Sequence, residues 1–543
     1  MTAKQQPQQQ RQPPPLRRFL GKEPGYDILT AMDTTFAKWF EGPSWDTWRA
    51  ILKAAFCLPM DGDEMALFKA VSGGRSAPKR RVRELWVIGG RRGGKDSVAS
   101  LIAVYMAAFF QVGLDKLRPG ERAQIQCLAV DRDQSKVVLE YIRSFFDHNK
   151  TLDNLVMRRT RDGLQLVNGC DIVVATNSFR AVRGRSVLVS IFDECAFWLN
   201  ERSARPDTET YNAVLPSLAT LPGSMLVGIS TPHRKSGLLF TKFRKYFGVD
   251  DDSTLVIRAP TTTLNPTIDP EAIERAMEEN PDKARAEWFA EFRDDISGFV
   301  DPEVVEACVM RHVRELPPAS GVRYFAFCDP SGGSSDSMTA AVCHREGDKV
   351  IVDCIRERRA PFAPSDVCLE FAAMFRSYGC GVVQSDKYGG LWITESFAKV
   401  GIRVEQSARS KSELYTDLLP LLNSQRIALL DNPRLVSQLC SLERSTSRVG
   451  RDTIDHADGA HDDIVNSVAG AAALAIANQG VHVSPELLQK VLAMPPRRRD
   501  TAWGVERRIR TMAYLNQITP RGRKVGYPEL MTSGEADDHD AQL

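Results

Sequence analysis

An uninterrupted strand, glycine-rich loop and helix lie between residues 84 and 111, and they limit the fold more strongly than any other part of the sequence. The strand is ELWVI, the loop is GGRRGGK at 89–95, and residues 97–111 have the apolar density of a buried helix. Glycines let successive backbone N–H groups surround phosphate oxygens at a helix start. The pattern predicts a phosphate-binding loop, with Lys95 reaching the β and γ phosphates of a nucleotide. The alternative, a glycine-rich turn that binds nothing, fits this strand-to-helix context poorly.

Position 96 departs from the pattern. A Ser or Thr that binds Mg²⁺ usually follows the lysine, whereas this chain has Asp96 and then Ser97. Either of these two residues takes that role, or the metal is held only through water. We expect nucleotide contacts from the whole loop, that is from Gly89, Gly90, Arg91, Arg92, Gly93, Gly94, Lys95, Asp96 and Ser97.

A second element about 100 residues downstream supports hydrolysis of the nucleotide. It is VLVSIFDE at 187–194, an apolar strand that ends in two acids. Asp193 is predicted to hold Mg²⁺ and Glu194 to polarise the attacking water. The segment GISTP at 228–232 also ends a strand, where its hydroxyl groups could sense the γ-phosphate; an ordinary turn is the other interpretation. Candidates for an arginine finger, acting in cis or from a neighbouring subunit, are Arg91, Arg92, Arg180, Arg183 and Arg185, all of which could equally be solvated basic residues.

The spacing of apolar segments predicts two α/β domains. Strands at 84–88, 124–130, 171–175, 187–192 and 224–229 alternate with helices at 97–111 and 133–146, which favours a mostly parallel sheet. A charged helical segment is expected at 270–293. The second half opens with an antiparallel meander of strands at 324–328, 338–343 and 349–355, followed by a helix at 365–377 and a strand at 381–385.

Length and composition agree with this division. The 543 residues exceed what one hydrophobic core holds. A net charge of +2 requires any nucleic-acid surface to come from local clusters of basic residues. The eleven cysteines show no zinc-binding spacing and are expected to be reduced and mostly buried. No apolar run is long enough to cross a membrane.

Acidic residues in the second half follow predicted strands or open a helix. Asp329 closes YFAFCD, Asp386 closes GVVQSD, and Asp462 and Asp463 open an Ala-rich helix. Clustered carboxylates of this kind hold the two cations of a metal-dependent phosphodiesterase. Each acid alone could instead belong to a turn or cap a helix. Asp336 is a weaker candidate.

Together, GGRRGGK, VLVSIFDE, GISTP, AEWFAEFRDDISGFVDPEVV and AHDDIVNSVAGAA resemble the large terminase subunit of tailed bacteriophages, over residues 40–475. The resemblance implies an additional-strand (ASCE-type) P-loop ATPase domain with a mostly parallel sheet, followed by a ribonuclease H-like nuclease domain. It assigns Lys95, Asp193 and Glu194 to ATP hydrolysis, and Asp329, Asp386 and Asp463 to the nuclease metals, with Asp463 preferred over Asp462.

The resemblance also implies cofactors and partners. These are ATP and Mg²⁺, with Mn²⁺ as an alternative at the nuclease site, double-stranded DNA, a portal protein, a terminase small subunit, and further copies of the chain in a ring on the portal. The place of action would be the host cytoplasm, with no membrane contact and no place in the mature virion. Two other functions stay open: a translocating ATPase whose C-terminal half is a non-catalytic adaptor, and a helicase or resolvase unconnected to capsids.

The expected domain limits are a Gln/Pro-rich tail at 1–25, the ATPase domain at 26–255, a connection at 256–318, the nuclease domain at 319–480 and an extension at 481–543. One feature of the family is not evident. Where a glutamine that contacts the adenine is expected upstream of the loop, the sequence is PSWDTW at 43–48.

Overall fold

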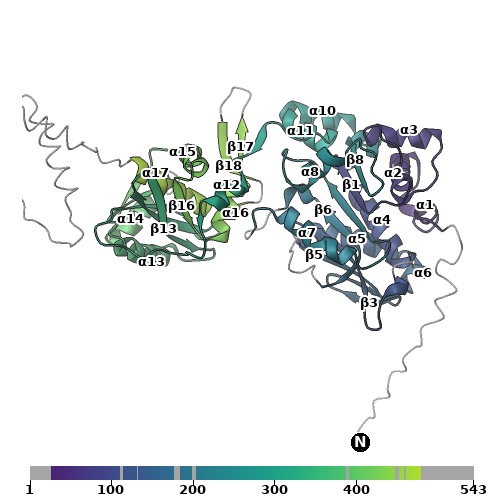
Figure 1. The fold of residues 1–543 in the computed structure, drawn as a ribbon, viewed down its shortest axis with the longest axis horizontal. Helices are drawn as coiled ribbons and strands as arrows, with labels where there is room; N and C mark the ends of the chain where they lie inside the picture. Colours follow the sequence, from purple (N-terminus) through teal and green to yellow (C-terminus); the bar gives the residue numbers. More distant parts are fainter. Residues whose placement is uncertain are drawn as a thin grey trace, which may run out of the picture. The chain divides into compact units, whose positions relative to one another are not determined.

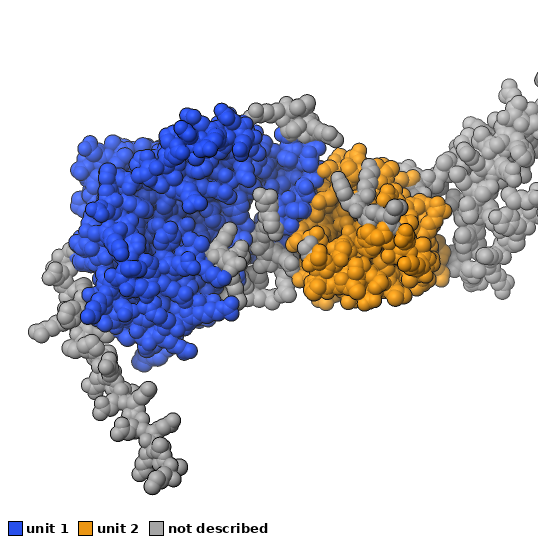
Figure 2. Space-filling model, turned by 180° about the vertical axis from the view of Figure 1, so that it is seen from behind, with its two compact units in different colours: residues 1–302, 436–460 blue, residues 303–435, 461–543 orange. Residues whose placement is uncertain are grey.

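The protein forms two compact units in a computed structural model that describes residues 26–110, 114–130, 132–176, 184–198, 203–334, 336–386, 390–446, 452–457 and 460–477. The first unit reaches Pro302 and also contains Val436–Ala460. The second unit holds Glu303–Leu435 and resumes at His461. Figure 2 colours the two units separately. Residues 256–302, expected as a connection, therefore lie in the first unit.

An eight-stranded sheet forms the centre of the first unit (Figure 1), in the order β3-β4-β5-β2-β6-β7-β1-β8. The six strands β5-β2-β6-β7-β1-β8 are all parallel to their neighbours. β3 and β4 form an antiparallel hairpin at one edge of the sheet, and β4 pairs antiparallel with β5. The strands are β1 (Glu84–Gly89), β2 (Ala123–Ala129), β3 (Val156–Thr160), β4 (Gly163–Leu166), β5 (Cys170–Thr176), β6 (Ser186–Asp193), β7 (Met225–Ser230) and β8 (Thr254–Ala259). Because β7 lies between β1 and β6, the sheet has the additional-strand arrangement that was predicted.

The helices of this unit include the two that were predicted at 97–111 and 133–146, which are α4 and α5. The full set is α1 (Ile28–Asp33), α2 (Asp46–Phe56), α3 (Gly62–Val71), α4 (Lys95–Ala108), α5 (Arg132–Asp147), α6 (Lys150–Asp153), α7 (Pro206–Leu218), α8 (Gly237–Tyr246), α9 (Thr261–Leu264), α10 (Pro270–Glu279) and α11 (Pro281–Phe289). The single helix expected at 270–293 is wrong. It divides at Asn280, because Pro281 disfavours helical backbone before it and the Asn280 side chain caps α11.

The second unit is built on a mixed sheet with the order β10-β16-β13-β12-β11-β14-β15. β11, β12 and β13 form an antiparallel meander, and β14 and β15 run parallel to β11. This is the ribonuclease H-like order, so the predicted fold class is confirmed. The strands are β10 (Val309–Met310), β11 (Tyr324–Asp329), β12 (Met338–Glu346), β13 (Lys349–Arg358), β14 (Val382–Ser385), β15 (Arg403–Gln406) and β16 (Ile427–Leu430). The helices from here on are α12 (Pro302–Ala307), α13 (Pro364–Ser377), α14 (Gly390–Lys399), α15 (Lys411–Asn423), α16 (Pro433–Ser441) and α17 (Asp463–Ala477).

A small antiparallel sheet contains two strands from the C-terminal half of the sequence that belong to the first unit. Its order is β18-β17-β9, with β9 at Ile296–Gly298, β17 at Leu442–Thr446 and β18 at Asp452–His456. The sequence did not predict this hairpin, because polar residues dominate both of its strands. Its position between α16 and α17 places it just before the acids that open α17.

Small residues bring α17 against the meander. A Cβ atom added to Gly470 would lie 2.2 Å from the ring of Phe327, a fully buried side chain on β11. The glycine therefore sets how closely the helix approaches the strand that ends at Asp329. None of the helices among the described residues is long and apolar enough to span a membrane.

We expect Gly470→Ala to destabilise the second unit. Alanine favours a helix by about 1 kcal/mol, but overpacking a rigid core costs about 1–3 kcal/mol, so the net effect is a loss of stability. Gly381→Ala is the control, because no atom lies within 4 Å of its added Cβ. Thermal unfolding of both variants measures the difference. An unchanged midpoint for Gly470→Ala would show that the ring of Phe327 moves aside freely.

Candidate active sites

Three neighbouring strand ends bring the predicted ATPase motifs together. In the parallel register Ile88 of β1 pairs with Ser230 of β7, and Ile229 of β7 pairs with Asp193 of β6. The phosphate loop, the GISTP turn and the acidic pair therefore leave the sheet side by side at one edge. Parallel strands always end at a common edge, which is where open α/β sheets bind ligands.

Lys95 lies at the centre of this edge and is almost fully buried. Its Nζ atom donates to the carbonyl oxygens of Gly89 and Gly90, both at 3.0 Å, and to Thr231 Oγ1 at 3.2 Å. Glu194 Oε1 lies 3.7 Å from the same nitrogen. The ammonium group thus joins the loop, the GISTP turn and the acidic pair.

The loop itself is packed so tightly that only glycine fits at several positions. An added Cβ at Gly90 would lie 2.1 Å from Thr261 Oγ1, and Gly94 has a positive φ of 81°. Residues distant in sequence support the loop through the carbonyl oxygens of Arg91, Arg92 and Gly93. The donors to these oxygens are Thr261 at 2.8 Å, Asn265 at 3.0 Å and Trp48 Nε1 at 2.8 Å.

The PSWDTW segment at 43–48, which has no glutamine to contact an adenine, therefore lies against the phosphate loop. Trp48 binds the loop backbone, and Trp45 lies 2.9 Å from the Cβ position of Gly94. The contacts from Trp48, Thr261 and Asn265 were missed at the sequence level, because a lone Trp or a Thr/Pro-rich segment carries no local signal for a distant loop.

Glu194 has a strained backbone and a fixed side chain. Its φ of 47° is in the left-handed region, which is uncommon for a residue other than glycine. Its Oε2 atom accepts hydrogen bonds from the Thr231 backbone N–H at 2.9 Å and from Ser230 Oγ at 3.1 Å. The carboxylate is therefore oriented by the end of β7, the strand between the two motifs.

Asp193 is a buried carboxyl group, and the charge of the half-buried Asp96 acts on it. Burial, together with the charges of Asp96 and Glu194, raises the pKa of Asp193 to about 8. Burial also raises the pKa of Asp96. Asp193 Oδ1 is buried and has no hydrogen-bond partner. Repelling carboxylates with an unpaired oxygen suit a divalent cation, so the residues present fit a Mg²⁺ ion beside the phosphates, with Asp193 and Asp96 to hold it.

The raised pKa gives a pH-dependent stability in metal-free protein. A carboxyl group whose pKa is raised by folding stabilises the fold while it is protonated, and this contribution disappears as pH rises from about 4 to about 8. We expect Asp193→Asn to remove that loss. In EDTA, the melting temperature of the wild type relative to Asp193→Asn should fall between pH 5 and pH 8. Parallel curves for the two proteins would contradict the raised pKa of Asp193.

Substitutions at 96 and 97 test which residue serves the ATPase metal. Because the charge of Asp96 acts on Asp193, we expect Asp96→Ala to lower ATP hydrolysis by about a hundredfold, the cost of losing one fixed electrostatic group. Asp96→Ser should retain much of the rate and Ser97→Ala should change it little. Steady-state phosphate release measures all three. Inactivity of Ser97→Ala alone would assign the metal to the Ser97 hydroxyl.

Three of the five candidates for an arginine finger lie among the described residues. Arg91 is exposed and pairs with Glu287 at 3.3 Å, Arg92 is exposed with φ 60°, and Arg185 is exposed. Arg180 and Arg183 lie outside the described residues. Nothing in the described part of the chain places Arg91, Arg92 or Arg185 among the acids of the site.

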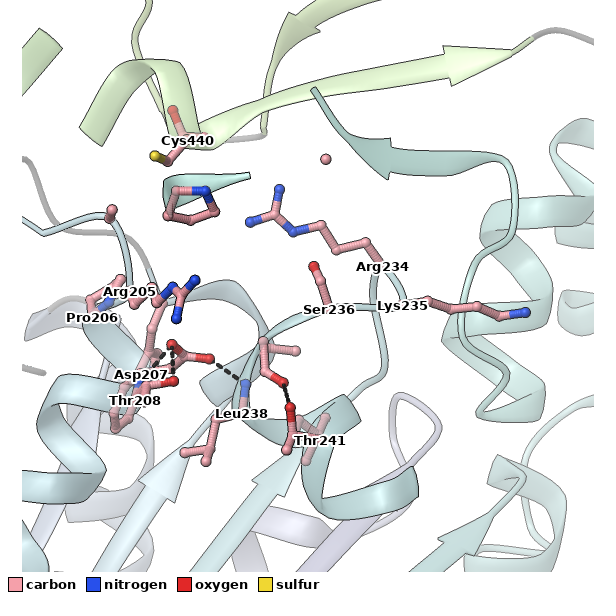
Figure 3. Close-up of a pocket in the computed structure, with 18 of the residues that line it drawn as sticks. Arg205, Pro206, Asp207, Thr208, Arg234, Lys235, Ser236, Leu238, Thr241 and Cys440 are labelled. Carbon is pink, nitrogen blue, oxygen red and sulfur yellow. Dashed lines mark hydrogen bonds between the residues drawn. The ribbon is translucent and has the colours of Figure 1, made fainter. Parts of the chain in front are cut away.

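A cavity of about 690 Å³ lies next to the acidic pair, on the side of Cys195 and Ala196. Figure 3 shows Asp207 hydrogen-bonded to Thr208 and to the backbone N–H of Leu238 at the start of α8. Lys235 forms an ion pair with Asp294 in the same wall. Because these charges already have partners, we assign no ligand to the cavity.

The nuclease candidates also meet at the end of adjacent strands. Cys328 of β11 pairs with Ser385 of β14, so Asp329 and Asp386 follow at neighbouring positions. Asp463 opens α17, and its carbonyl oxygen accepts a hydrogen bond of 2.6 Å from Thr339 Oγ1 on β12, opposite Asp329. Three elements thus bring the three predicted acids together.

Asp462 and Asp463 differ in their surroundings. Asp462 is buried; it accepts a hydrogen bond from Tyr415 OH and forms an ion pair with Lys411 Nζ, both at 2.7 Å. Asp463 is partly exposed and its buried Oδ2 atom has no hydrogen-bond partner. The contacts favour Asp463 as the group that faces a cation.

Burial and repulsion between neighbouring acids raise the pKa values of two of the nuclease acids. Burial raises the pKa of Asp329 well above its ordinary value, and the charges of Asp463 and Asp386 raise it further. Burial and the neighbouring Asp462 raise the pKa of Asp463 to about 6, with smaller contributions from Asp336 and Glu357. The donor set consists of oxygens, which suits Mg²⁺ or Mn²⁺. Asp329, Asp386 and Asp463 would hold the ions, which supply charge for phosphodiester cleavage.

Comparison with known proteins finds no matching family model and no matching curated protein. Among solved structures, the comparison finds large terminases. That of bacteriophage HK97 is 14% identical with a TM-score of 0.34, over 79% of this chain and 99% of that one. A point mutant of the large terminase ATPase domain of Thermus phage P74-26 is 16% identical with a TM-score of 0.32, over 44% and 97%. The large terminase nuclease of the thermophilic phage G20c with bound magnesium is 19% identical with a TM-score of 0.28, over 31% and 94%.

Proposed function

We propose that this chain is a bacteriophage terminase large subunit, which hydrolyses ATP to move double-stranded DNA into a procapsid and cuts the DNA at a second, metal-dependent site. One observation carries the proposal. A single chain places a phosphate loop beside an acidic pair on one sheet, and three converging carboxylates on another. ATP hydrolysis and DNA cleavage are the activities that these two sites support.

At the first site each residue has a distinct role. The N–H groups at the start of α4 and the Lys95 ammonium group bind phosphate oxygens. Asp193 and Asp96 hold the Mg²⁺ that neutralises phosphate charge. Glu194, fixed by Ser230 and Thr231, accepts the proton of the attacking water.

At the second site the cluster of Asp329, Asp386 and Asp463 accepts the scissile phosphate together with its cations. The clustered carboxylates repel the phosphate without a cation, which makes cleavage dependent on Mg²⁺ or Mn²⁺. Asp462 stays with Lys411 and Tyr415 and supports the start of α17.

The motifs resemble terminase motifs, and this resemblance supports the partners in the proposal. They are double-stranded DNA, a portal protein, a small subunit, and further copies of the chain in a ring. The host cytoplasm is the compartment in which such a machine meets newly made DNA.

Separate substitutions at the two sites test the proposal. We expect Glu194→Gln to lower ATP hydrolysis by about a hundredfold or more and to leave ATP-independent, Mn²⁺-dependent plasmid cleavage in place. Asp463→Asn should abolish cleavage and leave ATP hydrolysis in place. Phosphate release and plasmid nicking are measured on the same preparations.

The outcome separates this function from its alternatives. Plasmid cleavage that survives both Asp329→Ala and Asp463→Asn would show that the C-terminal half is an adaptor. Unwinding of a forked duplex, without any binding to a portal protein, would favour a helicase instead.

A further inference from the structure

Asn466 is a buried polar residue in the first turns of α17, where its surroundings do not explain it as a packing residue. It is 1% exposed and lies among Val465, Ser467 and Val468 in an otherwise Ala-rich helix. Asn is less favourable than Ala inside a helix, and burying its amide is costly unless the polar atoms are bonded. The position therefore calls for a polar role.

The amide group of Asn466 contacts one nuclease acid and lies near a second acid on another strand. Nδ2 donates to Asp386 Oδ2 at 3.0 Å. The same side chain lies close enough to Asp329 to lower the pKa of that carboxyl group, against the effect of burial. A primary amide has two N–H donors, so one side chain suffices for both acids. The carbonyl oxygen of the same amide, Oδ1, is buried without a hydrogen-bond partner.

We propose that Asn466 is the positioning residue of the nuclease site: its amide group holds the carboxyl groups of Asp329 and Asp386 side by side, in the arrangement that receives a divalent cation. The inference rests on the proposed nuclease function and deepens it. It adds to the three acids a residue that acts through two of them, and it leaves Oδ1 as an acceptor available within the site.

A neutral donor suits this task better than a cation. A lysine or arginine between two carboxylates would neutralise their charge and compete with the metal ion. Asp462 shows that outcome, because Lys411 and Tyr415 take up its carboxylate. The amide of Asn466 orients Asp329 and Asp386 and leaves their charge for the cation. Groups that orient metal ligands in this way change metal affinity when they are removed.

Metal affinity of the full chain tests the inference directly. Binding of Mn²⁺ alone is measured by calorimetry and by electron paramagnetic resonance, without DNA or nucleotide. The ATPase site is blocked in every protein by the background substitution Asp193→Asn. We expect Asn466→Ala to weaken Mn²⁺ binding by about ten- to a hundredfold. Asn466→Leu, which keeps the volume and removes the amide, should weaken it equally while retaining the fold.

Asn432→Ala is the matched control. Asn432 belongs to the same unit, and its side chain accepts hydrogen bonds from the backbone N–H groups of Arg434 and Leu435 at the start of α16. Its loss should lower the melting temperature, as loss of a helix cap does, with Mn²⁺ affinity unchanged. A purely structural role for Asn466 would give the same result as this control.

Two contrary results have separate meanings. If Asp329→Ala abolishes Mn²⁺ binding while both Asn466 variants bind as the wild type does, the role of Asn466 is overturned and the nuclease site stands. If Asp329→Ala also binds Mn²⁺ as the wild type does, the proposed nuclease site itself is overturned.

Discussion

Adjacent parallel strands must end at one edge of a sheet, and both candidate sites depend on this constraint. In the first unit it brings the glycine loop after β1, the Ser-Thr turn after β7 and the acids after β6 to one place. In the second unit it does the same for Asp329 at the end of β11 and Asp386 just after β14. A third element completes each site from outside the strands: α4 supplies Lys95, and α17 supplies Asp463. Hydrogen bonding within the sheet therefore determines the spacing of groups that lie far apart in sequence.

Both sites keep like charges close together, and the surrounding residues hold them without neutralising them fully. The charge of Asp96 acts on the buried Asp193, and the charges of Asp386 and Asp463 act on Asp329. By contrast, the buried carboxylate of Asp353 in the second unit has a partner, because its Oδ2 atom lies 2.7 Å from His344 Nδ1. Unpaired buried charge costs stability, so its presence at two strand edges indicates places where a cation completes the structure. The left-handed backbone of Glu194 is a further cost at the same edge.

Local patterns in the sequence predicted the strands, the phosphate loop and the acids, because each is encoded by a few neighbouring residues. Residues that act across the fold were not predictable in that way. Trp48 supports the loop from α2. Thr261 and Asn265 support it from the segment that follows β8, a part of the chain that was expected to be a connection between the domains. Asn466 was visible only as part of the AHDDIVN motif. Its role needed the positions of two strands 80 and about 140 residues away, in a cluster that the register of β11 and β14 creates.

The hairpin β17–β18 shows why the two halves of the sequence are not simply two halves of the structure. His233 follows Thr231, the residue that orients Glu194, by two positions, and its Nε2 atom lies 3.0 Å from Glu443 on β17. The backbone N–H of Arg293 donates to the carbonyl oxygen of His233, and β17 pairs with β9 directly beyond it. After β18 the chain continues through a few residues to Asp463. Glu194 is therefore connected to the hairpin by a continuous series of contacts through Thr231 and His233. From the hairpin, the covalent chain continues to Asp463 at the start of α17. The loop between β7 and α8 touches both the ATPase acid and the hairpin, through Thr231 and His233.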